Sequence, residues 1–183
     1  MFITRNSFSA PIMAPVIVIA GNGSSVAYTA SKLKDLLPNA ILVNYGDFWC
    51  NYLAQRVYGD LIFVGHGTLD GFYFDEVLIS WKQIANEIGR LPANRIYFAA
   101  CYSGQLEKYL RNRKKIIYVF KGLVDVDEAA YIIASVIYWL KGQVANSKKI
   151  LENLIEVMIG KIIDPWKYNL QFLYEIKKWR DIW

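Results

Sequence analysis

Residues 61–67 read LIFVGHG, a short apolar run that ends in glycine and in the single histidine of the chain, His66. Residues 96–104 read IYFAACYSG, a second apolar run that ends at Cys101. Short apolar runs that stop at turn residues are typical of strands buried on both faces of a parallel sheet. The two stretches therefore predict two buried strands, one with an imidazole and one with a thiol at its carboxyl end.

The rest of the chain repeats this alternation of buried strand and amphipathic segment. We expect strands at residues 16–20, 40–45, 60–64, 95–100 and 115–120, and a small hairpin at 68–80, where Asp70-Gly71 favours a turn. We expect a helix capped by Ser24 or Ser25 that ends at residue 37, a helix at 81–90 capped by Ser80, and helices at 48–58, 105–113 and 127–141. Two further helices are expected towards the C-terminus, at 148–163 and 166–183. Such alternation predicts a three-layer α/β/α fold, flavodoxin-like in type, with a mostly parallel sheet of about five or six strands.

The length of 183 residues and a hydrophobic fraction of 55% fit one domain with a large core. We expect a flexible arm at residues 1–14, an α/β catalytic domain at 15–146 and a helical extension at 147–183 that packs on the same domain. The arm does not read as a signal peptide. The apolar stretch at 129–140 is too short for a membrane span, which needs about 20 residues. We therefore expect a soluble, cytoplasmic protein without a membrane partner.

Charge and cysteine content exclude several classes of function. The net charge is +5, and the densest basic cluster, residues 111–115, lacks the spread of a nucleic-acid footprint. An ordinary surface turn is the expected setting of this cluster. The two cysteines, Cys50 and Cys101, form no CxxC or Cys/His ligand set, so we expect no metal and no cofactor. Cys50 is expected in the core.

The positions of His66 and Cys101 predict a catalytic pair if their strands are neighbours. Sites in open α/β sheets form beyond the carboxyl ends of the strands, where both side chains would emerge. The amides of Gly67 and Cys101 could bind an oxyanion, and a helix that begins near residue 105 could favour a thiolate. Asn22, Asn44 and Asp47 follow neighbouring strands and are candidates to orient His66, although a backbone carbonyl could serve equally well.

These two blocks resemble the caspase-like cysteine peptidases, a group that includes caspases, gingipains, clostripain, legumain, separase and bacterial CHAT domains. In that family an apolar strand precedes His-Gly and another precedes Ala-Cys. The sequence GLVDVDEAA at residues 122–130 also resembles CHAT-type members, so that the resemblance covers roughly residues 16–154. It implies a caspase-like fold, Cys101 as nucleophile, His66 as base, the amides of Gly67 and Cys101 as oxyanion hole, and a polypeptide substrate cleaved through a thioester.

The chain departs from the family where cleavage preference is set. Members that select arginine or lysine often carry an acid two residues before the cysteine, where this chain has Ala99. The preference is therefore open. Candidate substrate-binding residues are those near the expected rim of the site: Asp70, Asp75, Tyr102, Ser103, Asp125 and Asp127. Asp127 is equally well explained as the N-cap of the helix that follows. A regulatory protein partner or a homodimer is compatible with the sequence.

Two other functions remain open beside a cysteine endopeptidase. The first is a catalytically inactive caspase-like or flavodoxin-like module that binds another protein, to which the aromatic C-terminal helices would contribute. The second is a nucleotide-binding domain, because Gly21 and Gly23 begin a GxG motif. That motif fails at Val26, where the third glycine should allow close packing of helix and strand.

Overall fold

The computed structural model describes residues 14–48, 58–110 and 115–162, and its central feature is a five-stranded sheet. The strands are arranged in the order β2-β1-β3-β6-β7, and every neighbouring pair is parallel. Their bounds are β1 Val16–Ile19, β2 Ile41–Asn44, β3 Tyr58–Val64, β6 Ala93–Ala99 and β7 Ile116–Tyr118. The expectation of a mostly parallel sheet is confirmed.

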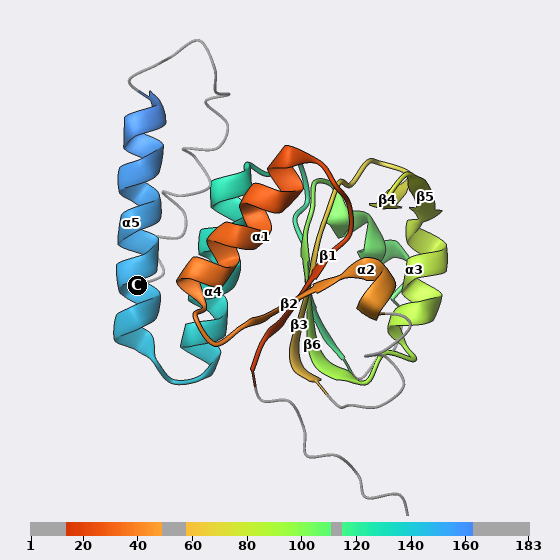
Figure 1. Cartoon of the computed structure of the whole chain (residues 1–183), viewed down its shortest axis with the longest axis horizontal. Helices are drawn as coiled ribbons and strands as arrows, with labels where there is room; N and C mark the ends of the chain where they lie inside the picture. Colours follow the sequence, from red (N-terminus) through yellow and green to blue (C-terminus); the bar gives the residue numbers. More distant parts are fainter. Residues whose placement is uncertain (1–13, 49–57, 111–114, 163–183) are drawn as a thin grey trace, which may run out of the picture.

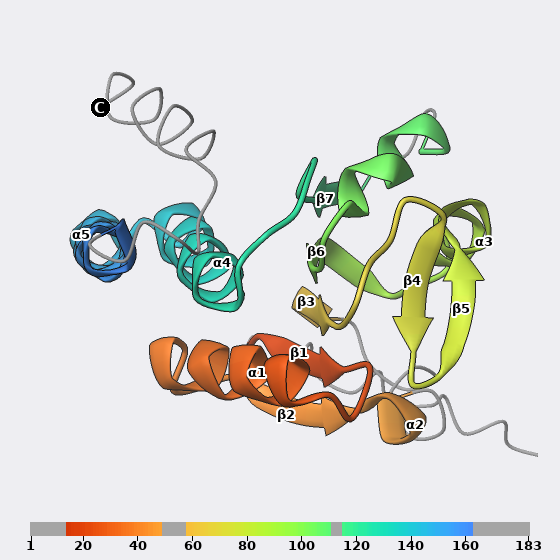
Figure 2. The ribbon, with the colours of Figure 1, turned by 90° about the horizontal axis from the view of Figure 1, so that it is seen from above.

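Helices cover both faces of this sheet, which confirms the three-layer prediction (Figures 1 and 2). Helices α1 (Ser24–Leu36) and α4 (Val126–Leu140) lie on one face, and α3 (Trp81–Ile88) lies on the other. Helix α5 (Val144–Ile162) packs on the outer side of α4, away from the sheet. It begins three residues before the boundary expected for the helical extension.

Alternation along each strand divides the buried residues into two cores. Val16 and Val18 of β1 join Phe63 and Phe98 in the core on the α3 side, whereas Ile17 joins the core under α1 and α4. Successive side chains of a strand point to opposite faces of the sheet. A strand covered by helices on both faces must therefore be apolar at every position, which explains the continuous apolar runs in the sequence.

A β-hairpin follows β3, as the sequence predicts, but its turn lies at Asp75 and Glu76 and not at Asp70-Gly71, since Gly71 already begins β4. Strands β4 (Gly71–Phe74) and β5 (Val77–Ser80) are antiparallel. Phe72 packs edge-on against Phe98, with ring centroids 5.6 Å apart, and also contacts Trp81. At the hairpin tip Asp75 has a left-handed backbone (φ 53°), and its N–H donates to the carbonyl of Ala20 at 2.7 Å. Both ends of the hairpin are thus fastened to the sheet.

The helix starts show which local signals determine the boundaries. Ser80 caps α3 and forms a capping box with Gln83, as expected. The N-cap of α4 is Asp125 and not Asp127, because Asp125 has a glutamate three residues later to complete the box, and Asp127 does not. Helix α1 begins at Ser24 after Gly23, without a side-chain cap, so the prediction of a serine cap is wrong.

Other boundaries differ from the sequence expectations. The segment expected as a helix at 105–113 forms η2, a 3-10 helix at Ser103–Lys108. The helix expected at 48–58 cannot extend to residue 58, because β3 already begins at Tyr58. A short helix, α2 (Tyr45–Asp47), precedes this segment, and residues 49–57, with Cys50, lie outside the described residues. Most of the expected arm, part of the basic cluster at 111–115 and the expected helix at 166–183 also lie outside them.

No helix in the described part of the chain is both long enough and apolar enough to cross a membrane.

A buried ionic cluster lies where β3 begins, at the opposite end of the strand from His66. The carboxylate of Asp60 is fully buried and accepts two hydrogen bonds from the Arg95 guanidinium, at 2.6 and 3.0 Å. The Tyr97 hydroxyl donates to the same carboxylate at 3.0 Å, and Lys141 Nζ lies 3.8 Å from it. Burial, followed by the charge of Asp60, raises the pKa of Tyr97, so the phenol stays a neutral donor.

Candidate active site

The register of β3 and β6 brings His66 and Cys101 to one side of the sheet. The two strands are parallel neighbours, which is the condition for the predicted catalytic pair, and Val64 is paired with Ala99. His66 and Cys101 each follow two residues after this pair. The period-two alternation of strands therefore directs both side chains to the face of Val64 and Ala99, which α1 and α4 cover.

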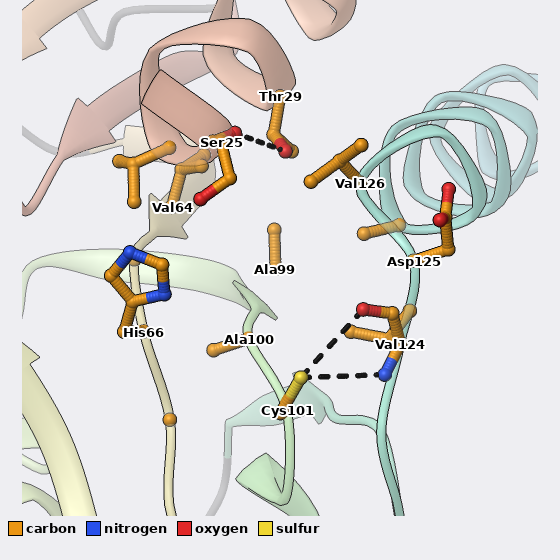
Figure 3. A pocket seen from close by; sticks show the side chains of 14 residues that line it. Ser25, Thr29, Val64, His66, Ala99, Ala100, Cys101, Val124, Asp125 and Val126 are labelled. Carbon is orange, nitrogen blue, oxygen red and sulfur yellow. Dashed lines mark hydrogen bonds between the residues drawn. The ribbon is translucent and has the colours of Figure 1, made fainter. Parts of the chain in front are cut away.

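Both side chains line a single pocket at the carboxyl edge of the sheet (Figure 3). Its volume is about 400 Å³, which includes the open mouth. Four parts of the fold contribute to its wall: the first turns of α1, the end of β3, the end of β6 and the start of α4. The described residues that line it are Ser25, Val26, Thr29, Val64, Gly65, His66, Gly67, Ala99, Ala100, Cys101, Val124, Asp125, Val126 and Ala129.

Cys101 is half-buried, and the backbone of Val124 contacts its sulfur. The Val124 N–H donates to Sγ at 3.4 Å, and the thiol can donate to the Val124 carbonyl at 3.6 Å. The N–H bond strengthens when the sulfur becomes negative, because charge-assisted hydrogen bonds are the stronger kind. The sequence predicts that a helix beginning near residue 105 stabilises the thiolate of Cys101. The described residues there form η2, a 3-10 helix of six residues, and not an α-helix. Sequence reasoning missed Val124, whose backbone contact leaves no signature in residue type.

His66 is exposed, and its ring stands against the loop between β1 and α1. A Cβ atom added to Gly23 would lie 2.9 Å from Nε2 of His66, so a glycine at this position leaves room for the ring. Within the described part of the chain neither ring nitrogen has a hydrogen-bond partner. Asn22, Asn44 and Asp47 are all exposed and form no hydrogen bond with His66.

The loops that carry the pair touch through their backbones. A Cβ atom at Gly67 would collide with the carbonyl oxygen of Cys101, so only glycine allows this approach. The next amide along each loop is already hydrogen-bonded: the Thr68 N–H donates to the carbonyl of Gly71 and the Tyr102 N–H to that of Gly122, both at 2.8 Å. The amides of Gly67 and Cys101 donate to no acceptor among the described residues. Two N–H groups beside the thiol are thus available to a ligand.

The hydroxyl of Ser103 holds the cysteine loop and does not line the pocket. Its side chain is fully buried, accepts the Phe120 N–H at 2.8 Å and lies 3.5 Å from the Phe98 carbonyl. Tyr102 forms the turn directly after Cys101, with a left-handed backbone (φ 54°), and also lies outside the pocket lining.

The expected acidic rim is reduced to one residue. Asp70 and Asp75 are exposed on the hairpin and do not line the pocket. Asp127 accepts a hydrogen bond from the Tyr28 hydroxyl at 2.9 Å, also away from the pocket. Asp125 does line the pocket, and its carboxylate accepts the Asp127 N–H at 3.0 Å as the cap of α4.

No family model, no curated protein and no solved structure matches the chain. The resemblance to caspase-like peptidases therefore stays a prediction from the two sequence blocks. Among the described residues, no group of three or more His, Cys, Asp or Glu side chains is placed to hold a metal ion.

Proposed function

We propose that this protein is a caspase-like cysteine endopeptidase that cleaves polypeptides through a thioester intermediate. The observation that carries the proposal is the shared pocket of His66 and Cys101, which lies beside the unbonded amides of Gly67 and Cys101. A nucleophile, a base and two donors for an oxyanion are the groups that acyl transfer requires. All of these groups lie just beyond the carboxyl ends of β3 and β6.

The reaction divides into two acyl transfers. His66 takes the thiol proton of Cys101 as Sγ attacks the scissile carbonyl carbon, and the carbonyl electrons move to the oxygen, which the amides of Gly67 and Cys101 stabilise. His66 gives that proton to the leaving nitrogen as the C–N bond breaks, and a thioester remains on Cys101. His66 then takes a proton from water as the water oxygen attacks the thioester. The C–S bond breaks, His66 returns the proton to Sγ, and the carboxylic acid and the free thiol are released.

The contact with Val124 fits a sulfur that cycles between thiol and thiolate. The carbonyl of Val124 accepts only from the protonated thiol, whereas its N–H donates to sulfur in either state. The chemistry also needs a reduced Cys101, which a reducing cytoplasm maintains. We therefore place the activity in the cytoplasm, with a polypeptide as substrate and with a regulatory protein or a second copy as possible further partners.

The test is cleavage of an unfolded protein substrate, reduced casein, with the products mapped by mass spectrometry. We expect cleavage by the wild type and loss of about 1,000-fold or more in rate for Cys101→Ala and His66→Ala, since residues of a catalytic unit fail together. Cys50→Ala is the matched control and should retain the rate. Cleavage that persists in Cys101→Ala refutes the proposal. A wild type that neither cleaves nor reacts with a peptide acyloxymethyl ketone at Cys101, yet binds another protein stably, is instead an inactive interaction module.

A further inference from the structure

We propose that the pocket beside Cys101 binds an uncharged aliphatic side chain, from alanine to leucine in size, on the residue before the scissile bond. Ala99 and Ala129 set its depth in this proposal. The inference rests on the proposed endopeptidase function, because it assigns the side chain that the same pocket would hold during acyl transfer.

The floor of the pocket is apolar and nearly closed to solvent. Val26, Val64, Ala99 and Ala129 are between 1% and 5% exposed and come from four different elements, α1, β3, β6 and α4. Figure 3 shows Val64, Ala99 and Val126 around the hollow above Cys101. An apolar side chain that enters gains about 0.8 kcal/mol for each buried CH₂ group. The two alanines leave space that larger residues would fill.

The one lining carboxylate is already engaged at the start of α4. Apart from His66 and Cys101, Asp125 is the one ionisable residue among the described residues that line the pocket. Its carboxylate accepts the Asp127 N–H as the cap of α4, and Glu128 accepts the Asp125 N–H at 3.2 Å in return. Figure 3 shows this carboxylate beside the first turn of α4. A lysine or arginine of the substrate would have to compete with this cap, and an acidic side chain would face the same carboxylate, so both are disfavoured relative to an apolar side chain.

The buried hydroxyl of the pocket offers little to a polar side chain. Thr29 is 4% exposed, and its Oγ1 donates to the carbonyl of Ser25 at 2.9 Å. Its proton is thus already used within the first turns of α1. The hydroxyl of Ser25, which is half-buried, is the remaining polar side-chain group on this wall. A methyl or isopropyl group of the substrate can enter the pocket without displacing any of these hydrogen bonds.

The experiment is digestion of a proteome-derived peptide library, with Cys101→Ala as the background, followed by mass spectrometry of the new termini. We expect Ala, Val or Leu before the cleaved bond and at least about 100-fold lower kcat/KM for matched peptides with Lys, Arg, Asp or Glu there. Ala129→Leu, which fills the pocket, should shift preference from Leu towards Ala by about tenfold or more. Ala99→Val is a second filling variant on a different element, used if Ala129→Leu does not fold. Asp125→Asn should leave the ranking of side chains as it is.

The outcomes separate this inference from the proposed function. Cleavage that depends on Cys101 but occurs after charged residues overturns the pocket assignment and leaves the endopeptidase proposal standing. A preference for Lys or Arg that disappears in Asp125→Asn would assign selection to Asp125 instead. If Ala129→Leu and Ala99→Val fold but keep the wild-type cleavage preference, Ala99 and Ala129 do not set the depth of the pocket. Absence of any cleavage that depends on Cys101 overturns both proposals.

Discussion

Gly23→Ala tests whether the β1–α1 loop positions His66 for catalysis. The new Cβ atom would lie 2.9 Å from Nε2 of His66, whereas ordinary van der Waals contacts begin near 3.4 Å. The difference is about 0.5 Å, and the ring must retreat by at least this much because Gly23 belongs to the backbone of a fixed turn. A misplacement of 1 Å in an active site costs about 100-fold in rate. We therefore expect roughly a tenfold loss in kcat/KM, about 1.4 kcal/mol.

The same substitution should leave stability almost unchanged. Gly23 has an extended backbone (φ −66°, ψ 144°) that alanine adopts without strain. Lower entropy of the unfolded chain stabilises the variant by about 0.4–1 kcal/mol, and alanine, a weaker N-cap than glycine, costs a similar amount. A change in activity without a change in the free energy of unfolding would therefore point to displacement of the ring.

The assay is the rate of Cys101 alkylation by iodoacetamide as a function of pH, read by peptide mass spectrometry to distinguish Cys101 from Cys50. A positioning effect predicts slower alkylation and a changed pH profile in Gly23→Ala. Gly21→Ala is the matched control, because a Cβ atom there meets nothing within 4 Å. Equal pH profiles for Gly23→Ala and the wild type, with both proteins folded, would refute the reasoning.

Three further predictions concern stability and can all be measured by urea denaturation. Asp60→Asn should lower the free energy of unfolding by about 3–5 kcal/mol, because it leaves Arg95 without its charged partner. The alkylation rate of Cys101 should not change. A loss of stability below about 1 kcal/mol would contradict this prediction. Burial raises the pKa of Tyr97 above the ordinary tyrosine value of about 10, so above that pH the unfolded state binds fewer protons than the folded state and stability falls as pH rises. Tyr97→Phe should reduce that alkaline loss, and an unchanged slope would argue against it. Phe72→Ala should cost about 3–5 kcal/mol by emptying the contact between hairpin and sheet, and a smaller effect would show that the hairpin packs loosely.

The sequence predicts the parts of the fold that depend on local pattern. The apolar runs before His66 and Cys101 identify buried strands, and Ser80 identifies the start of α3, because each signal is contained within a few consecutive residues. The alternation predicts a parallel sheet but not the order of its strands, so the neighbouring of β3 and β6 is a condition of the predicted pair, which the structure meets. This is enough to predict that the imidazole and the thiol emerge at one edge of the sheet.

Features that depend on distant segments could not be predicted in this way. Val124 contacts the Cys101 sulfur through its backbone. The ring of His66, after β3, lies against Gly23, after the neighbouring strand β1. Neither contact requires a distinctive residue type at a fixed spacing. The N-cap of α4 was mistaken by two residues, although Glu128 supplied the signal that selects Asp125. Ser103 reads as a site residue from its place after Cys101, but tertiary contacts with Phe98 and Phe120 bury it.

The charged cluster of Asp60 and Arg95 lies at the beginning of strands whose other ends carry the pocket. Mutations that enlarge or reshape the pocket act on side chains that do not touch this cluster, so their effects on unfolding should add independently. Substitutions around Val26 and Ala129 can therefore change the pocket without weakening the ion pair of Asp60 and Arg95. Libraries of variants should accordingly keep the fold when the pocket edge of the sheet is varied and lose it when the opposite edge is varied.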